Sequence, residues 1–398
     1  MLITILPQEL VDSVIDLVPE HELDHDNNAG LKLTRESVED LRALSRVCRA
    51  TRERSQKHLF QKLVINNPKY CRGLRTVLTA NPCLSAYVKH IVVRSYDQRR
   101  SKALQTVINA CRGLETLSFL YLDDFTRWPG ACLVPSEFPA LRRLEVARCT
   151  INNYDDIAEV LAGMPALQEL HLSATCIERI VSGGAWTQQR KRLESLELRR
   201  MHCVVSGPDT TVAFTRGFQQ VKKLDLTLHS SFDYDILRNL ALPQIGVEHL
   251  TLAVDWYWAE LPYDLCADFG DDPDRGTTFL SLTLQERPPE NNFRMFFGGR
   301  WASRLLLAIP STQLERVCVR LEYRRGGDPW DGFEWTAVDN ALGCATRFPT
   351  LREVRVEIGE RWAHWYEADE DPSLEDPFVV AVKAELPRVA ERGILIIQ

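Results

Sequence analysis

The stretch LRRLEV, residues 141–146, decides how this chain is expected to fold. It is a hexad with apolar residues at its first, fourth and sixth positions, and the same hexad begins again at residues 114, 167, 193, 221 and 247. From 114 through 141 to 247, successive starts lie 27, 26, 26, 28 and 26 residues apart. A fixed period of this size marks a chain of stacked structural units. Alternating apolar positions are typical of strands with one buried face, so each hexad predicts one strand.

The hexad continues from this centre toward both ends of the chain. It begins at Phe60 and Val88 on one side and at Phe279, Leu314 and Leu351 on the other. From 247 through 279 and 314 to 351, the intervals grow to 32, 35 and 37 residues. We therefore expect longer loops after residue 252, with a last strand at 394–396.

Helical stretches are expected between the strands, at residues 102–111, 155–164 and 376–390, because their apolar residues recur at helical spacing. Phrases such as Phe348-Pro349-Thr350-Leu351 separate a helix from the next strand. Proline ends a helix and makes the preceding residue extended. A repeated strand-loop-helix unit predicts an α/β fold with a parallel sheet.

This pattern resembles leucine-rich-repeat proteins. The resemblance implies a right-handed solenoid with a concave parallel β-sheet over residues 61–398, built from about 10–12 repeats. Such folds bind other macromolecules along the concave face. Cys149, Cys176 and Cys203 each follow a predicted strand, and we expect them to be small buried thiols in the repeat turn.

Residues 1–60 do not follow the repeat and predict three short helices. Pro7 suits a helix start, and a second amphipathic segment begins near Ser37. The motifs run in the order Leu6-Pro7-x-Glu9-Leu10, Val14-Ile15-x-Leu17, Leu41-x-x-Leu44-Ser45-x-Val47-Cys48-Arg49 and His58-Leu59-Phe60. This order resembles an F-box. An insert at about residues 19–36 departs from the family pattern, which turns here within a few residues.

The two resemblances together point to F-box proteins of the leucine-rich-repeat type, which are substrate-recognition subunits of SCF-type ubiquitin ligases. They imply that residues 1–60 dock on a Skp-type adaptor, which links to a cullin and a RING protein. The solenoid would hold a target protein, and the subunit would perform no covalent chemistry and need no cofactor. The positions that match adaptor-packing residues of the motif are Leu6, Pro7, Leu10, Val14, Ile15, Val47 and Cys48.

Aromatic residues and arginines gather in the late loops, and seven of the nine tryptophans lie from residue 256 onward. Trp, Tyr and Arg are enriched at binding hot spots. We therefore hypothesise that these loops bind the target; the alternative is that their side chains pack on one another to fill a widened arc. The residues concerned are Trp256, Tyr257, Trp258, Tyr323, Arg324, Arg325, Trp362, Trp365 and Tyr366.

Composition excludes several other classes of protein. The net charge of −7 and the pI of about 5.8 argue against a nucleic-acid binder, which usually carries a basic stripe. The 11 cysteines include no Cys-x-x-Cys pair, so neither a zinc site nor a disulfide framework is expected and a reducing compartment fits. Without a secretory signal or a long apolar run, we expect a cytoplasmic or nuclear protein that does not engage a membrane.

Two other functions stay open at this point. A leucine-rich-repeat scaffold could use the N-terminal helices only as a cover for the first repeat, without any ligase. An enzyme would need a convergent set of acid, base and nucleophile, and the sequence offers none.

Overall fold

The structure is a computed structural model that divides into two compact units, Met1–Val181 and Ser182–Gln398. The ranges below contain nine helices and twelve strands of parallel sheet, five strands in the first unit and seven in the second. The structure describes residues 8–18, 21–23, 31–94, 101–122, 139–151, 160–161, 164–177, 191–199, 201–203, 218–219, 221–228, 247–255, 280–287, 305–306, 313–321, 334–358 and 377–398.

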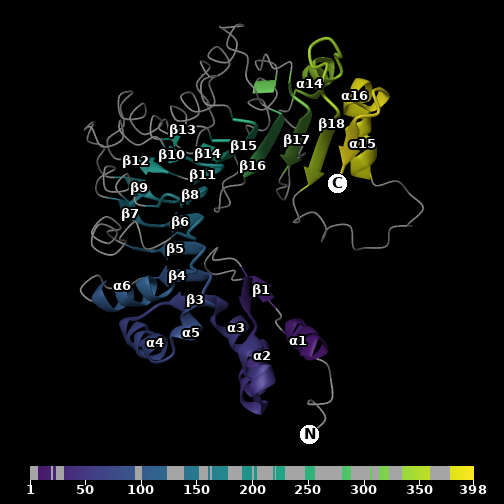
Figure 1. Ribbon diagram of the computed structural model, residues 1–398. Coiled ribbons are helices and arrows are strands. Elements are labelled where there is room, and N and C mark those ends of the chain that lie inside the picture. The colour runs from purple at the N-terminus through teal and green to yellow at the C-terminus, as the bar shows by residue number, and fades with distance from the viewer. Residues whose placement is uncertain are drawn as a thin grey trace. The chain divides into compact units, whose positions relative to one another are not determined.

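The five strands of the first unit follow one another in chain order and run parallel (Figure 1). Equivalent hexad positions lie opposite each other: Ile91 pairs with Leu117, and Leu117 with Leu144. The predicted strands are therefore confirmed here. The strands are β3 (Lys62–Ile65), β4 (His90–Arg94), β5 (Thr116–Leu120), β6 (Arg143–Ala147) and β8 (Glu169–Ser173).

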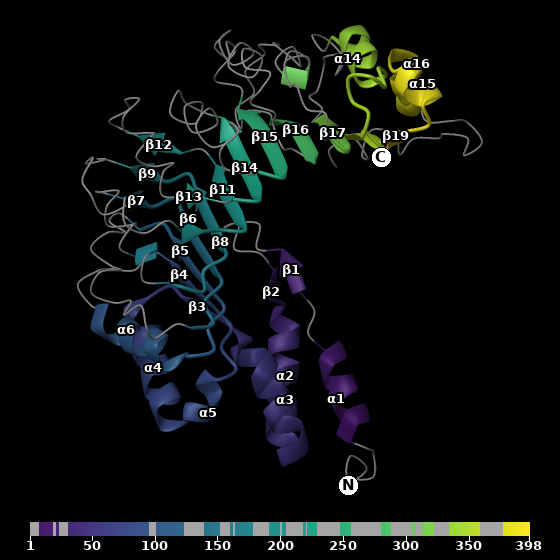
Figure 2. The same ribbon diagram turned by 45° about the horizontal axis from the view of Figure 1, so that its top comes forward.

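The seven strands of the second unit are also parallel and in register (Figure 2). Leu224 pairs with Leu250, which pairs with Leu282, although the loop before β16 is longer. The growing intervals therefore change the loops and leave the ladder intact. The strands are β11 (Ser195–Arg199), β14 (Lys223–Leu228), β15 (His249–Asp255), β16 (Ser281–Arg287), β17 (Arg316–Leu321), β18 (Glu353–Ile358) and β19 (Leu395–Ile397).

The hexad residues form the core of each ladder. Leu117, Leu144 and Leu170 are each 0% exposed, whereas the intervening Arg143 and Glu145 are only partly buried. Successive side chains on a strand point to opposite faces, so the period of two assigns the leucines to one face. Each fully buried leucine contributes about 1.5–3 kcal/mol of transfer free energy, which makes this face the main stabilising surface.

A tight turn follows β5, β6 and β8 at one repeat position. Tyr121, Arg148 and Ala174 have φ angles of 60°, 53° and 47°, in the left-handed region that residues other than glycine rarely adopt. After β6 and β8, the next residue bonds a carbonyl within the turn: Cys149 Sγ lies 3.3 Å from the Ala147 carbonyl oxygen, and Thr175 Oγ1 donates to the Ser173 carbonyl over 3.1 Å.

The expected buried thiol is confirmed for Cys149, which is 2% exposed. It is wrong for Cys176, which lies one residue beyond the equivalent position and is only partly buried. In these two turns the position holds a compact, buried side chain that bonds a backbone carbonyl, and Thr175 does so as well as Cys149. The side chain of Cys203 lies outside the described residues.

In the first unit, helices and short strands lie between the ladder strands or directly after them along the chain. Asn67 caps α4 by accepting from the Tyr70 backbone N–H over 2.7 Å, and α4 packs on α6 (Figure 1). The helix predicted at 102–111 is confirmed as α6, and of the one predicted at 155–164 the structure describes three residues, of which 160–161 are helical. The elements are α4 (Pro68–Ala80), α5 (Pro82–Ser85), α6 (Ser101–Ala110), β7 (Thr150–Ile151) and its parallel partner β9 (Cys176–Ile177).

The second unit has three helices near its C-terminal end, one before β18 and two between β18 and β19. The single helix expected at 376–390 is wrong, because Leu386 has φ −119° and ψ 53° and Pro387 begins a new helix. Proline disfavours the helical conformation in the residue before it, so the apolar pattern runs across a break. The elements are β10 (Lys191–Arg192), β12 (His202–Cys203), β13 (Phe218–Gln219), α14 (Trp335–Leu342), α15 (Pro377–Glu385) and α16 (Pro387–Glu391).

Candidate functional site

Three N-terminal helices precede β3: α1 (Gln8–Leu17), α2 (Arg35–Val47) and α3 (Arg49–Gln61). Thr34 caps α2 by accepting from the Ser37 backbone N–H over 3.2 Å. Cys48 is extended, with φ −158° and ψ 175°, and this one residue separates α2 from α3. The two helices pack on each other, and α1 packs on α3.

The segment between α1 and α2 contains a short antiparallel hairpin. Its strands are β1 (His21–Leu23) and β2 (Leu31–Leu33), paired from His21 with Leu33 to Leu23 with Leu31. The hairpin occupies part of the insert expected at residues 19–36, and Leu33 packs against the helices. The insert therefore contributes to the packing of the helices that it connects.

The inner face of α1 forms a small apolar core with α2 and α3. Val11, Ile15 and Leu41 are 6%, 1% and 0% exposed. Residues that are partly buried against them are Val18, Leu33, Leu44 and Leu59. With only three fully buried apolar residues, this core supplies a limited part of the docking free energy of α1.

A second apolar face of α1 remains exposed. Leu10, Val14 and Leu17, here called the outer stripe, are 53%, 60% and 82% exposed. Their spacing of four and three residues aligns them along one side of the helix. Val47, the last residue of α2, is likewise 57% exposed. A helix with apolar residues on two faces, one of them uncovered, is suited to bind a partner.

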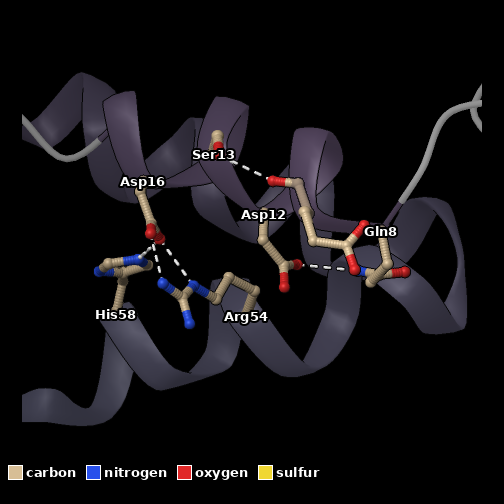
Figure 3. A network of polar contacts seen from close by, with 7 residues as sticks. Gln8, Asp12, Ser13, Asp16, Arg54 and His58 are labelled. Atoms are coloured by element: carbon tan, nitrogen blue, oxygen red, sulfur yellow. Dashed lines mark hydrogen bonds and ion pairs between the residues drawn. The ribbon is translucent and has the colours of Figure 1, made fainter.

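Polar contacts between α1 and α3 form the Asp16 network, which comprises Asp16, Arg54 and His58 (Figure 3). Arg54 Nε donates to Asp16 Oδ1 over 2.7 Å, and a second guanidinium nitrogen of Arg54 bonds Oδ2. His58 Nε2 lies 2.8 Å from Asp16 Oδ1. The hydrogen bond from Arg54, followed by that from His58, holds the pKa of Asp16 well below its usual range.

The residues expected to bind the adaptor occupy different environments. Leu10, Val14 and Val47 are exposed, whereas Ile15 is in the small core. Cys48 is partly buried, with its Sγ 3.5 Å from Thr51 Oγ1. Leu6 and Pro7 lie outside the described residues. The sequence motif gave no sign that Ile15 and Val14, adjacent in the chain, serve opposite faces.

The residues expected to bind the target all lie outside the described part of the chain: Trp256, Tyr257, Trp258, Tyr323, Arg324, Arg325, Trp362, Trp365 and Tyr366. The strands before them are described. β15, β17 and β18 are parallel and end at Asp255, Leu321 and Ile358. The chain therefore leaves all three strands at the same edge of the second unit's sheet.

Sequence reasoning missed a polar chain across three strands of the first unit. His90 Nε2 lies 2.9 Å from Ser118 Oγ, which donates to Glu145 Oε2 over 2.8 Å. Since the hydroxyl proton of Ser118 goes to the carboxylate, His90 must donate through Nε2. Burial, assisted by the charges of Lys62 and Arg143, lowers the pKa of His90 to about 4, so the imidazole is neutral at pH 7.

The hydrogen-bonded residues His90, Ser118 and Glu145 are not arranged for nucleophilic catalysis. Ser118 is 0% exposed and donates to Glu145, so its lone pair is not activated by the histidine. The three residues lie 28 and 27 positions apart, about one repeat each, a periodicity that could have flagged them. Their arrangement satisfies a buried hydroxyl on the polar face of the sheet.

Neither protein-family models nor curated protein sequences match this chain. Among the residues that the structure describes, no three His, Cys, Asp or Glu side chains gather as a metal ion would require. No helix in the described ranges has the length and apolar character needed to cross a bilayer.

Proposed function

We propose that this chain is the substrate-recognition subunit of an SCF-type ubiquitin ligase. The proposal rests on the outer stripe of α1: the small helical module directly before β3 exposes a second apolar face. Residues 1–60 would be an F-box that docks on a Skp-type adaptor, which links to a cullin and a RING protein. The parallel ladders from β3 onward would form a right-handed leucine-rich-repeat solenoid.

In this proposal the subunit acts by proximity and performs no bond chemistry. The N-terminal helices fix the chain to the ligase, and the late loops hold the target protein. Holding both raises the effective concentration of target lysines near the ubiquitin-loaded enzyme. No metal or cofactor takes part in this role.

Replacing Leu10 with aspartate tests adaptor docking. We expect co-elution of the full chain with a purified Skp-type adaptor to be lost for Leu10→Asp, since burying an unpaired carboxylate opposes association. Val380→Asp is the matched control, because Val380 is 48% exposed on α15 and lies far along the chain. Retained co-elution of Leu10→Asp would contradict the proposal.

Target capture is tested in the late loops. Trp258→Ala or Arg325→Ala is expected to reduce target recovery by the assembled ligase while adaptor binding stays unchanged. Recovery at the wild-type level would assign these residues to loop packing.

The second candidate is a leucine-rich-repeat scaffold without a ligase, favoured by the regular twelve-strand pattern alone. Size-exclusion chromatography with the adaptor, comparing the full chain with one lacking residues 1–60, separates the two functions. A full chain that elutes alone would make the N-terminal helices a cover for the first strand.

A further inference from the structure

The contact between α1 and α3 has an apolar part and a polar part of different character. The apolar part is the small core around Ile15, which resists sliding only weakly because apolar contact is not directional. The polar part is the Asp16 network, whose hydrogen bonds have fixed lengths and angles. The polar part therefore defines the position of α1 along α3 more precisely than the apolar part does.

The hydrogen bonds drawn between α1 and α3 in Figure 3 all involve Asp16. Gln8, Asp12 and Asp16 follow one another at intervals of four residues along the helix. Asp12 accepts from Gln8 Nε2 over 2.8 Å, a contact inside α1, and Ser13 donates to the Glu9 carbonyl, also inside α1. Asp16 bonds both Arg54 and His58 of α3.

Arg54 and His58 together fix the orientation of the Asp16 carboxylate. Arg54 approaches both carboxylate oxygens with two nitrogens, which fixes the plane of the carboxylate. His58 lies one helical turn from Arg54 and bonds the same Oδ1. Because an ionised carboxylate only accepts, His58 Nε2 must carry a hydrogen atom. Two donors one turn apart on α3 define both the rotation and the axial position of α1.

We propose that Asp16 is a positioning residue that acts through Arg54 and His58 to hold α1 in one place on α3, so that the outer stripe is presented to the adaptor already ordered. This inference rests on the proposed function. A helix ordered before binding avoids the entropic cost of ordering during association. Without the network, α1 would stay attached through its small core but move on α3, and the adaptor would have to select one position.

The network is partly open to water: the side chains of Arg54, His58 and Asp16 are 33%, 20% and 38% exposed. Exposed single ion pairs contribute little, whereas bidentate contacts and networks contribute more. We therefore expect a moderate effect, about three- to tenfold, on both the opening of α1 and adaptor affinity.

The experiment uses the full chain and four proteins: wild type, Asp16→Asn, Asp12→Asn and the double variant Asp16→Arg with Arg54→Asp. Asp16→Asn removes the charge at constant size. Asp12→Asn is the matched control: it removes a carboxylate one turn earlier on the same helix, which is hydrogen-bonded inside α1 and acts on Arg54 through its charge alone. The double variant exchanges the two charges and restores an ion pair that a loss of packing alone would not recover.

Two measurements are made. The first is amide hydrogen exchange of residues 8–17 in the chain alone; the second is the dissociation constant for a purified Skp-type adaptor. We expect Asp16→Asn to raise the exchange rate and the dissociation constant about three- to tenfold. Asp12→Asn should stay within about twofold of wild type, and the charge exchange should recover at least part of the loss.

Each result decides between the positioning role and the proposed function. Equal exchange in wild type and Asp16→Asn overturns the positioning role, and so does a double variant that recovers nothing. Faster exchange with unchanged adaptor affinity also overturns it, since the stripe would then not need a fixed helix. A wild-type chain that does not bind the adaptor overturns the proposed function, whereas the exchange rates still decide whether Asp16 holds α1.

Discussion

Helices α14 and α16, near the C-terminal end of the chain, and helix α1, near the N-terminal end, use their apolar side chains in opposite ways. At the C-terminal end, α14 and α16 bury their large apolar residues: Trp335, Leu342 and Val389 are 5%, 0% and 0% exposed. At the N-terminal end, α1 buries Ile15 and leaves the outer stripe exposed. One group consumes its apolar surface in its own packing, and the other retains some for a partner.

The polar contacts of these helices also differ, because those at the C-terminal end are buried and those of α1 are partly exposed. Asp339 is 4% exposed and accepts from the backbone N–H groups of Arg388 and Val389 at the start of α16, over 3.2 and 3.0 Å. Arg392 donates to the carbonyls of Leu342 and Leu351. The Asp16 network is instead partly exposed. The buried network fixes α14 and α16 to each other out of reach of water, whereas the Asp16 network holds α1 through bonds that water and salt can reach.

The first test compares a buried and an exposed leucine of the N-terminal helices. Leu41→Ala should cost about 3 kcal/mol of stability, because Leu41 is 0% exposed and its removal leaves a cavity. Leu10→Ala should stay within about 0.5 kcal/mol. The measurement is the opening free energy of α2 and α3 from amide exchange. Equal losses for both would mean that Leu10 is packed, and the contrast between the two chain ends would fail.

The second test addresses the close approach of α14 and α16. A Cβ at Gly343 would lie 2.5 Å from Arg388 Cβ and 2.6 Å from the Asp339 carbonyl oxygen, so Gly343→Ala should cost about 2–3 kcal/mol. Gly73 in α4 has no atom within 4 Å of such a Cβ, and Gly73→Ala should stabilise by about 0.5–1 kcal/mol. Denaturant unfolding of each variant measures the difference. A neutral Gly343→Ala would show that the C-terminal helices adapt more readily than their packing indicates.

The third test removes the buried cap of α16. Asp339→Ala should cost about 2 kcal/mol, because two backbone N–H groups lose their acceptor in a buried position. Asp339→Asn retains one side-chain oxygen and should lose about half as much. Amide exchange at residues 388 and 389 reports the change directly. Unaltered exchange in Asp339→Ala would remove the buried network from the comparison.

The smallest expected effect is that of salt. Raising sodium chloride from about 0.05 M to about 1 M shortens the screening length to about 3 Å and weakens exposed ion pairs. Exchange of residues 8–17 should rise about two- to threefold, and exchange at α16 should not change. Equal salt sensitivity at the two ends would show that the Asp16 network is no more exposed to ions than the Asp339 cap.

Local patterns in the sequence were sufficient to predict the strands of the long parallel ladders, but not the hairpin β1–β2 or the short strands outside the ladders. The hexads that begin at residues 114 to 351 could be predicted as strands for two reasons. Alternation with a period of two shows which side chains share a face, and the repeat interval shows which strands are equivalent. The phrase Phe348-Pro349-Thr350-Leu351 lies between α14 and β18, but it does not end the helix, because α14 already stops at Leu342. The prediction failed at Leu386, where apolar spacing continued across Pro387 and hid a helix break.

The sequence by itself thus determined the repeat, the parallel strands and the outline of the N-terminal helices, since each follows from spacing along one segment. Only the tertiary structure decided which of Val14 and Ile15 is exposed, and that Asp16 meets Arg54, 38 residues later. It also decided that Asp339 caps α16 from 50 residues away. These contacts depend on how separate segments pack, and spacing within one segment carries no record of the position of another.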